Sequence, residues 1–381
     1  MYSTKFGVFL PPAHNPAVSP YVALRHDIES CVLLDDLGMD EVWVGEHHSS
    51  GWSTLSSPEL FIAAVARETR RIRFATGIIP LPYHHPLHTA ERILLLDHLT
   101  DGRIILGCGT GTYLHDMEMI GLDSGSIRGH FRAALDVIQA LMRGEMVDTT
   151  TPWFTTKKAV LQLRPLKDPI ETVVVSSLAD EAIKLLIDTR TRPIVHVTPP
   201  WGVIRPGVSP WGVGADVDPL PSLAQRVAAY REKSGETVRV RCCVFVHICD
   251  SVAKGIDELM RGWSAQRNTL WRSVMGLPIS DSPTAHREAL EGLVEQGTFI
   301  VGDAAACTRM IQDLADRLGD PVSFIFNVYG WLSHKATLDQ VTALAREVIP
   351  NLTGAFKGTE ESMRLTSEEA SRQMKRRSAL R

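Results

Sequence analysis

A regular alternation of short apolar runs with amphipathic segments, over residues 5–106, constrains the fold of this chain most. The runs are rich in β-branched and aromatic residues, which is typical of buried strands. They cover Lys5–Leu10, Glu41–Gly45, Ile72–Ile79 and Arg103–Leu106. Between them lie segments with helical spacing, such as Tyr21–Leu37, which stops at Gly38. This alternation predicts a parallel sheet with helical crossovers.

The same alternation returns later in the chain, with strands expected at Thr172–Val175, Ile194–Val197, Val238–Ile248 and Phe324–Val328. About eight parallel strands over roughly 350 residues indicate a (β/α)8 TIM barrel, with a doubly wound parallel sheet as the alternative. We expect a single barrel domain over residues 1–355, with insertions at about 153–166, 199–221 and 267–297. Residues 356–381 are expected to form a charged C-terminal tail.

Charge and cysteine usage exclude several classes of function. The net charge is -4 at pH 7, so neither nucleic acid nor an anionic membrane is expected as a partner. The six cysteines follow no zinc-site or disulfide spacing. No signal pattern and no bilayer-spanning apolar stretch is present. We therefore expect a soluble cytoplasmic protein.

Polar, titratable residues follow two of the expected strands. Glu46, His47 and His48 end the second strand, and successive side chains there face opposite ways, so at most one histidine points into a barrel lumen. His84, His85 and His88 follow the third strand. Several imidazoles at one rim raise the alternative of a metal site, but their spacing matches no common ligand pattern, and no metal is predicted.

Two further motifs bear on cofactor binding. Gly107, Gly109 and Gly111 follow the fourth strand, where glycines let a flat cofactor approach the backbone. A Rossmann dinucleotide site would need this loop after the first strand, so that alternative is weak. Ser176 and Ser177 end the strand before a helix, where serines either cap the helix or bind phosphate.

In this order, the motifs KFGVFL, DEVWVGEHH, IRFATGIIPLPYHHP, LLLDHLTDGRIILGCGTG and TVVVSS resemble those of the bacterial luciferase-like flavin-dependent monooxygenases. The resemblance covers nearly the whole chain and is thinnest between Pro199 and Gly297. It implies a (β/α)8 barrel that binds reduced FMN (FMNH2) at its carboxyl-end mouth. It further implies oxygenation of a small, largely apolar organic substrate by O2 through a C4a-(hydro)peroxyflavin.

The resemblance also implies roles for individual residues. His47 matches the catalytic histidine, and a non-proline cis peptide is expected at Gly77-Ile78. The implied cofactor-binding residues are Glu46, Gly77, Ile78, Gly109, Thr110, Tyr113, Arg128, Ser176 and Ser177, with Arg128 and Ser177 on the phosphate. The expected substrate pocket includes His48, His85, Cys108 and Trp201. Gly109 and Thr110 replace a reactive cysteine and an arginine of luciferase itself, which argues against light emission.

The partners expected from the resemblance are a separate NAD(P)H:flavin reductase and a second copy of this chain. A reductase is needed because no nicotinamide motif is present. A homodimer would form through the helices expected at Glu59–Arg70 and Thr89–Leu99. Three alternatives remain at this stage: an F420-dependent oxidoreductase of the same barrel superfamily, a metal-dependent hydrolase, and a non-catalytic flavin-binding subunit.

Overall fold

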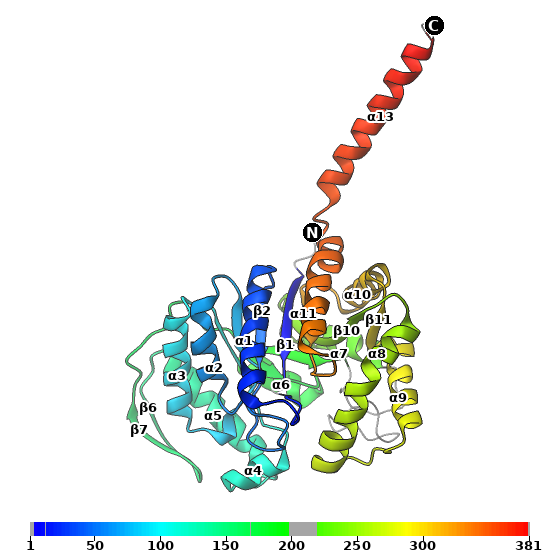
Figure 1. Ribbon diagram of the computed structural model, residues 1–381. Coiled ribbons are helices and arrows are strands. Elements are labelled where there is room, and N and C mark those ends of the chain that lie inside the picture. The colour runs from blue at the N-terminus through cyan, green and yellow to red at the C-terminus, as the bar shows by residue number, and fades with distance from the viewer. Residues whose placement is uncertain (1–3, 12, 168, 198–218, 380–381) are drawn as a thin grey trace.

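The structure is a computed structural model that describes residues 4–11, 13–167, 169–197 and 219–379 (Figure 1). Eight parallel strands form the barrel, and the pairing of the last strand with the first closes it. In chain order they are β1 (Lys5–Leu10), β2 (Glu41–Val44), β3 (Arg73–Thr76), β5 (Ile104–Gly109), β8 (Thr172–Val175), β9 (Arg192–His196), β10 (Val240–Ile248) and β12 (Val322–Asn327). The predicted (β/α)8 barrel is therefore confirmed.

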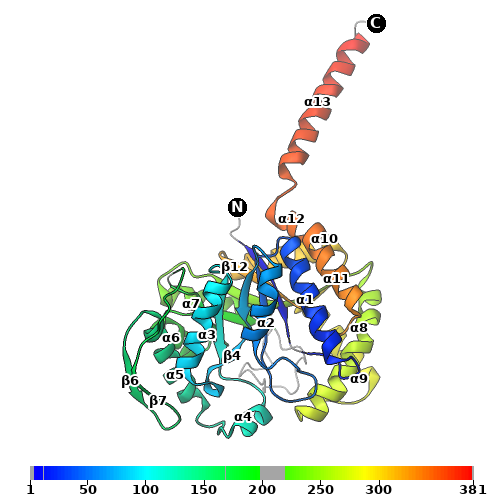
Figure 2. The ribbon, with the colours of Figure 1, turned by 60° about the vertical axis from the view of Figure 1, so that its left-hand side comes forward.

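Helices surround the sheet, as Figures 1 and 2 show. Among them are α1 (Pro20–Asp36), α2 (Pro58–Val65), α3 (Pro86–Leu99), α5 (Ile127–Met142), α6 (Asp180–Asp188), α7 (Pro219–Ser234), α8 (Val252–Gln266) and α11 (His334–Ala343). Several begin with proline, whose fixed φ suits the first helical turn. None of the helices in the described ranges is both long and apolar enough to span a membrane.

The third strand is shorter than predicted. β3 ends at Thr76, and the two-residue strand β4 (Ile79–Pro80) then pairs with β5. The intervening peptide between Gly77 and Ile78 is cis. A Cβ on Gly77 would lie 2.7 Å from Cε2 of Phe9, so packing against β1 by itself requires glycine there.

The sequence prediction missed several elements, among them one strand and the helix that follows it. β11 (Phe299–Gly302) pairs with the carboxyl half of β10, and α10 (Ala304–Leu318) follows it. The segment expected as an insertion at about 267–297 contains a π-helix, η3 (Arg267–Val274), and α9 (Pro283–Glu295). At the insertion expected at about 153–166, the structure has an antiparallel ribbon of β6 (Val147–Thr150) and β7 (Thr155–Ala159), which begins before residue 153. Most of the expected insertion 199–221 lies outside the described residues.

Large side chains fill the barrel interior. Trp43, Ala75, Ile105, Val173, Ile194, Cys243 and Ile325 form one buried cluster inside the sheet. A second and larger cluster lies between the sheet and the helices, where α5, for example, contributes Phe131, Leu135 and Ile138. Because the interior is packed, the barrel has no pore, and ligands must bind at one of its ends.

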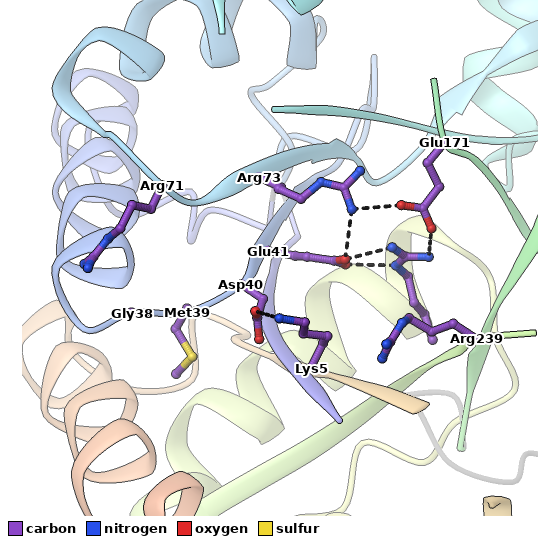
Figure 3. Close-up of a pocket in the computed structure, with 10 residues that line it drawn as sticks. Lys5, Gly38, Met39, Asp40, Glu41, Arg71, Arg73, Glu171 and Arg239 are labelled. Carbon is purple, nitrogen blue, oxygen red and sulfur yellow. Dashed lines mark hydrogen bonds and ion pairs between the residues drawn. The ribbon is translucent and has the colours of Figure 1, made fainter. Parts of the chain in front are cut away.

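The amino-terminal end of the barrel carries a buried ionic cluster (Figure 3). Arg241 donates to both oxygens of Glu41 at 2.8 and 2.7 Å and to Glu171 at 2.8 Å. Arg73 donates to the other oxygen of Glu171 at 2.8 Å. Burial raises the pKa of Glu171, but the Arg241 and Arg73 guanidinium groups outweigh it and lower that pKa to about 2. The cluster borders a pocket of about 370 Å³ at the end of the barrel where catalysis is not expected, so we assign the cluster to stability.

The Arg241 cluster gives a stability prediction. Arg241→Met should lower the free energy of unfolding by about 3–5 kcal/mol, because it leaves the buried Glu41 carboxylate with only the more distant Arg73 guanidinium at 3.8 Å. The exposed pair of Arg143 with Glu145 is the matched control, and Arg143→Met should cost less than about 1 kcal/mol. Urea unfolding of both variants measures this difference, and equal losses would contradict the structural role of the cluster.

Candidate active site

Closure of the barrel brings the carboxyl ends of its strands together at one rim, which we call the mouth. Glu46 and His47 follow β2, and Asn327 ends β12. The cis peptide Gly77-Ile78 follows β3, and Gly109 ends β5. Residues from distant parts of the sequence thus meet at the end of the barrel where parallel barrels bind ligands.

Asp116 holds His47 at the mouth. It lies on α4 (Leu114–Ile120), and its side chain is 1% exposed. Nδ1 of His47 lies 3.2 Å from one carboxylate oxygen, and the Ser49 hydroxyl donates to the other. A carboxylate only accepts, so we infer that Nδ1 of His47 carries the proton and that Nε2 is left as the basic nitrogen.

The same carboxylate is held strongly in its ionised form. Burial alone would raise the pKa of Asp116, but hydrogen bonds from His47, Ser49 and the backbone N–H of His48 lower it below its usual value. Tyr113 stacks on the His47 ring, with 3.9 Å between ring centroids and 16° between their planes. His47 is therefore fixed in position and orientation by a charge on one side and an aromatic face on the other.

Glu46 organises the second group of imidazoles. Its Oε1 accepts from Nε2 of His48 at 2.9 Å and from Nε2 of His84 at 2.6 Å. Burial raises the pKa of Glu46, but these two hydrogen bonds bring it below the usual value. The hydrogen bond to Glu46 raises the pKa of His48. Oε2 of Glu46 is buried and has no hydrogen-bond partner within the described ranges.

The spacing of Glu46, His48 and His84 would also suit a metal ion, because their ligand atoms lie within 4.8 Å of one another. Nδ1 of His84, however, lies 3.5 Å from an Arg92 nitrogen, which can only donate. Nδ1 therefore accepts, and the ring proton sits on Nε2, facing Glu46. This arrangement favours a hydrogen-bond network over metal ligation, since a metal would need Nε2 without its proton.

Tyr83 and the glycine loop form another side of the mouth. Tyr83 ends the 3₁₀ turn η2 (Leu81–Tyr83), and its hydroxyl is buried without a partner among the described residues. Gly111 has φ +88°, and a Cβ there would collide with that hydroxyl. Burial raises the pKa of Tyr83 well above its usual value, so its hydroxyl stays protonated and can donate to a ligand.

The residues expected at a phosphate lie on two helix starts. Ser176 and Ser177 precede α6 and accept from the backbone N–H groups of Leu178 and Ala179 at 3.0 and 3.4 Å. Both serines therefore form local turns just before α6, whose N-cap residue is Ala179 and has no side-chain cap. Arg128 is exposed in the first turn of α5 and has no ion pair with a described residue. Thr110 donates to the Gly111 carbonyl oxygen at 3.3 Å.

The residues expected in the substrate pocket are spread over different environments. His48 is hydrogen-bonded to Glu46. His85 caps α3 and places Nε2 3.4 Å from the Thr155 carbonyl oxygen, so it faces the β6–β7 ribbon. Cys108 differs most from the expectation: Ile105 lies in the lumen, so strand alternation turns Cys108 outward into the core beneath the helices. Trp201 lies outside the described residues.

Three residues at the mouth were missed by the sequence prediction: Tyr83, Asn327 and above all Asp116. Asp116 lies three residues after Tyr113, so one turn of helix places both beside His47. That spacing is the only signal in the sequence, and it does not indicate which imidazole the carboxylate meets.

Unpaired polar atoms at the mouth test whether a flavin fits there. Oε2 of Glu46, the Tyr83 hydroxyl and Oδ1 of Asn327 are buried and have no partner among the described residues. Each such group costs about 1–3 kcal/mol unless something binds it. Two acceptors and one donor, around a wall of glycines, match the N–H and C=O groups on the edge of an isoalloxazine ring. The residues present therefore fit a flavin.

Comparison with known proteins gives matches along the whole chain. A family model described as luciferase-like monooxygenase matches residues 4–200. The 4-hydroxyprotoasukamycin monooxygenase of Streptomyces nodosus subsp. asukaensis is 36% identical over 97% of this chain and 98% of its own length. Limonene 1,2-monooxygenase of Rhodococcus erythropolis is 30% identical, over 92% of this chain and 87% of its own length. The oxygenase component of a flavin-dependent trigonelline monooxygenase from Acinetobacter baylyi gives a shorter match. It is 30% identical over 37% of this chain and 40% of its own length.

Solved structures share the fold at low sequence identity. The oxygenating constituent of 3,6-diketocamphane monooxygenase from Pseudomonas putida, in complex with FMN, has a TM-score of 0.73 at 20% identity, covering 92% of this chain and 99% of that chain. An F420-dependent secondary alcohol dehydrogenase has a TM-score of 0.66 at 16% identity, with the same two coverages. At these identities, the likeness establishes the barrel and leaves the cofactor open.

The Glu46–His48 contact predicts a pH-dependent contribution to stability. The folded-state pKa of His48 lies above its ordinary 6.5, so the contact stabilises fully below pH 6.5 and loses its effect as the pH rises through the folded-state pKa. His48→Gln should therefore lower the free energy of unfolding more at about pH 6 than at about pH 9. The control is His88→Gln, because the His88 side chain is 67% exposed beside Glu91. A His48→Gln loss that is the same at both pH values would refute the assignment.

Proposed function

The chain belongs to the family of luciferase-like monooxygenases, and we propose that it uses reduced FMN and O2 to oxygenate a small, largely apolar organic substrate. Its monooxygenase relatives, at 30–36% identity over most of the chain, support oxygenase activity. The observation that carries the proposal is the geometry at the mouth, where Asp116 and Tyr113 fix His47 beside unpaired buried polar atoms.

We assign the flavin ring to the wall formed by Gly77, Ile78 and Gly109, and its polar edge to Glu46 and Tyr83. The phosphate is assigned to Arg128 and Ser177, with Ser176 and Thr110 beside them. Arg128 suits this role because it is exposed and makes no ion pair with a described residue. Asp180 and Glu181 in the first turn of α6 oppose a phosphate at the serines, which leaves most of the charge neutralisation to Arg128.

Reduced FMN, when bound, would supply the electrons that activate O2. The protein's own part is to hold a proton beside that chemistry and to exclude water. Asp116 keeps the proton of His47 on Nδ1, so Nε2 can accept and return a proton at the reacting centre. Tyr113 fixes the ring against rotation. This arrangement resembles the carboxylate–imidazole pair that orients a general base in hydrolases.

An apolar substrate is supported by the aromatic cluster next to His47. Trp263, Trp271, Phe245, Phe299 and Trp331 pack together, and Tyr113 packs against this cluster. Tyr113 in turn stacks on His47, so the cluster and the catalytic group are connected through one ring. Limonene, the compound that names one relative, is itself an apolar terpene. Segment 267–297, which supplies Trp271, is the proposed cover of the mouth.

We propose two partners: a separate NAD(P)H:flavin reductase and a second copy of this chain. The relative described as an oxygenase component supports the reductase. Leu60 on α2 and Leu95 and Leu99 on α3 are 74%, 51% and 47% exposed, which supports a dimer through these helices. All six cysteines are free, as expected for the cytoplasm.

F420 is the alternative cofactor, because an F420-dependent dehydrogenase shares the fold. A hydride-transfer enzyme of that kind would need no oxygen. Titration of the protein with FMN and with F420 separates the two proposals, since we expect saturable binding of reduced FMN and none of F420.

His47→Asn should retain FMN binding and lose oxygenated product by about 10²- to 10⁴-fold, because the proton at the reacting centre is lost. The assay uses a panel of terpenes that includes limonene, with a flavin reductase, and measures both product and hydrogen peroxide. His88→Asn, an exposed histidine on α3, is the control. Wild-type turnover by His47→Asn would rule out the catalytic role.

Asp116→Asn should lower product formation less than His47→Asn does. The amide oxygen can still accept from Nδ1 of His47, but the amide NH2 can equally donate to Nδ1, so the proton is no longer held there. The loss should appear in kcat while the Kd for FMN stays unchanged, and an unchanged kcat would show that Asp116 has a packing role only.

Arg128→Ala should raise the Kd for FMN by about tenfold or more and leave the Kd for riboflavin unchanged, because only FMN carries the phosphate. Quenching of flavin fluorescence measures both constants. Arg132→Ala, one turn further along α5, is the matched control because Arg132 is paired with Asp136. Equal losses for the two flavins would place the phosphate elsewhere.

A further inference from the structure

The last helix, α13 (Lys357–Ala379), extends away from the barrel in both views of the ribbon (Figures 1 and 2). Residues 355–376 are all exposed. A helix whose described side chains are all exposed is only marginally stable in water, even when its sequence favours it. Ion pairs of Arg364 with Glu361 and Glu368, both at 2.6 Å, stabilise its middle. Its length and isolation therefore raise the question of what covers it.

Charge is divided unevenly along α13. Its four glutamates are Glu360, Glu361, Glu368 and Glu369, and all precede residue 370. After Ala370 come Arg372, Lys375, Arg376 and Arg377, and no acidic residue follows. Glu360 at one end and Lys375 and Arg376 at the other make no ion pair with any described residue. Lys357 and Arg364 also lie in the first half, so the formal charge is -2 over residues 357–369 and +4 over residues 370–379. The two halves thus carry opposite net charges that the helix does not itself neutralise.

A narrow, partly apolar seam runs along one face of α13 and starts at Phe356, the residue before the helix. Phe356, Met363 and Ala370 are spaced by seven residues, and Met374 follows four residues later. At 100° per residue these positions share one face with Glu360 and Ser367, so the heptad spacing is that of a coiled-coil seam with two polar positions. Phe356 and Met363 are 42% and 72% exposed. Ala370 is small enough to let another helix approach closely.

We propose that α13 pairs antiparallel with α13 of a second copy of this chain, along the seam of Phe356, Met363, Ala370 and Met374. In this orientation, the acidic first half of each helix faces the basic second half of the other. A parallel pair would place like charges opposite each other at both ends. Because one patch serves both partners, the contact is closed by a two-fold axis.

The charge distribution also argues against other binding partners for α13. A surface of one sign, such as an anionic membrane or an acidic protein, would attract the basic half of α13 and repel its acidic half. Only a partner with the reverse charge order matches both halves, and a second α13 running the other way has that order. The pairing is independent of the α2–α3 contact and of the proposed chemistry.

Distances between spin labels test the pairing in the full-length protein. Labels are placed at Thr366→Cys, near the middle of α13, or at Thr359→Cys, near its start. Both variants carry Cys249→Ser, because Cys249 is the partly exposed thiol and the other five are buried. An antiparallel pair predicts a distance near the interaxial spacing of about 10 Å, broadened by the label, at Thr366 and one of roughly 25 Å at Thr359.

Charge reversal provides the matched controls. Glu360→Lys with Glu361→Lys should abolish the short distance at Thr366, and so should Lys375→Glu with Arg376→Glu. All four changes together should restore it, because the reversed helices are again complementary. A mere loss of helix in the charge variants would not be rescued in this way.

Three results would overturn the proposal. One is the absence of any short distance at Thr366 in the wild-type background. Another is a short distance at both labels, which indicates a parallel pair. The third is binding of α13 to vesicles of anionic lipid without any pairing, which would assign the helix to a membrane surface.

Discussion

The pairing of β12 with β1 is the constraint on which the rest of the structure depends. It places Phe9 beside Asn327 and so joins residues from the two ends of the folded chain. Once the sheet is closed, every strand delivers its carboxyl end to one rim, and the packed lumen leaves ligands only the ends of the barrel. The Arg241 cluster closes the opposite end with paired charges. At the mouth, buried polar atoms such as Oε2 of Glu46 and the Tyr83 hydroxyl are left without a partner among the described residues.

At the mouth, two buried carboxylates hydrogen-bond different imidazoles. Asp116 accepts from His47, and Glu46 accepts from His48 and His84. This division follows from the chain itself, because neighbouring residues after a strand turn to opposite sides. The consequence is chemical: His47 has its proton on Nδ1 and a basic Nε2, whereas His48 has a raised pKa and neutralises Glu46. Of the two adjacent histidines, His47 therefore provides a basic nitrogen and His48 holds the Glu46 carboxylate.

The sequence predicted the barrel from strand–helix alternation, and the family resemblance is confirmed by the relatives. β11 and α10 were missed because eight strands already complete the predicted barrel. The four-residue strand β11 pairs with β10 outside that set of eight. Cys108 was expected near the substrate, but the direction of its side chain depends on the alternation of β5, which the sequence does not fix. Asp116 was missed because its partner lies 69 residues away, a contact that only the closed fold creates. The roles assigned to the individual residues of the mouth stay predictions.

The measurement that tests the account most directly is an anaerobic titration of the protein with reduced FMN, followed by rapid mixing with oxygenated buffer. The account predicts saturable binding, and then a transient spectrum distinct from both reduced and oxidised flavin, whose decay changes in His47→Asn. Failure to bind reduced FMN, or oxidation at the rate of free flavin with no transient species, would contradict it.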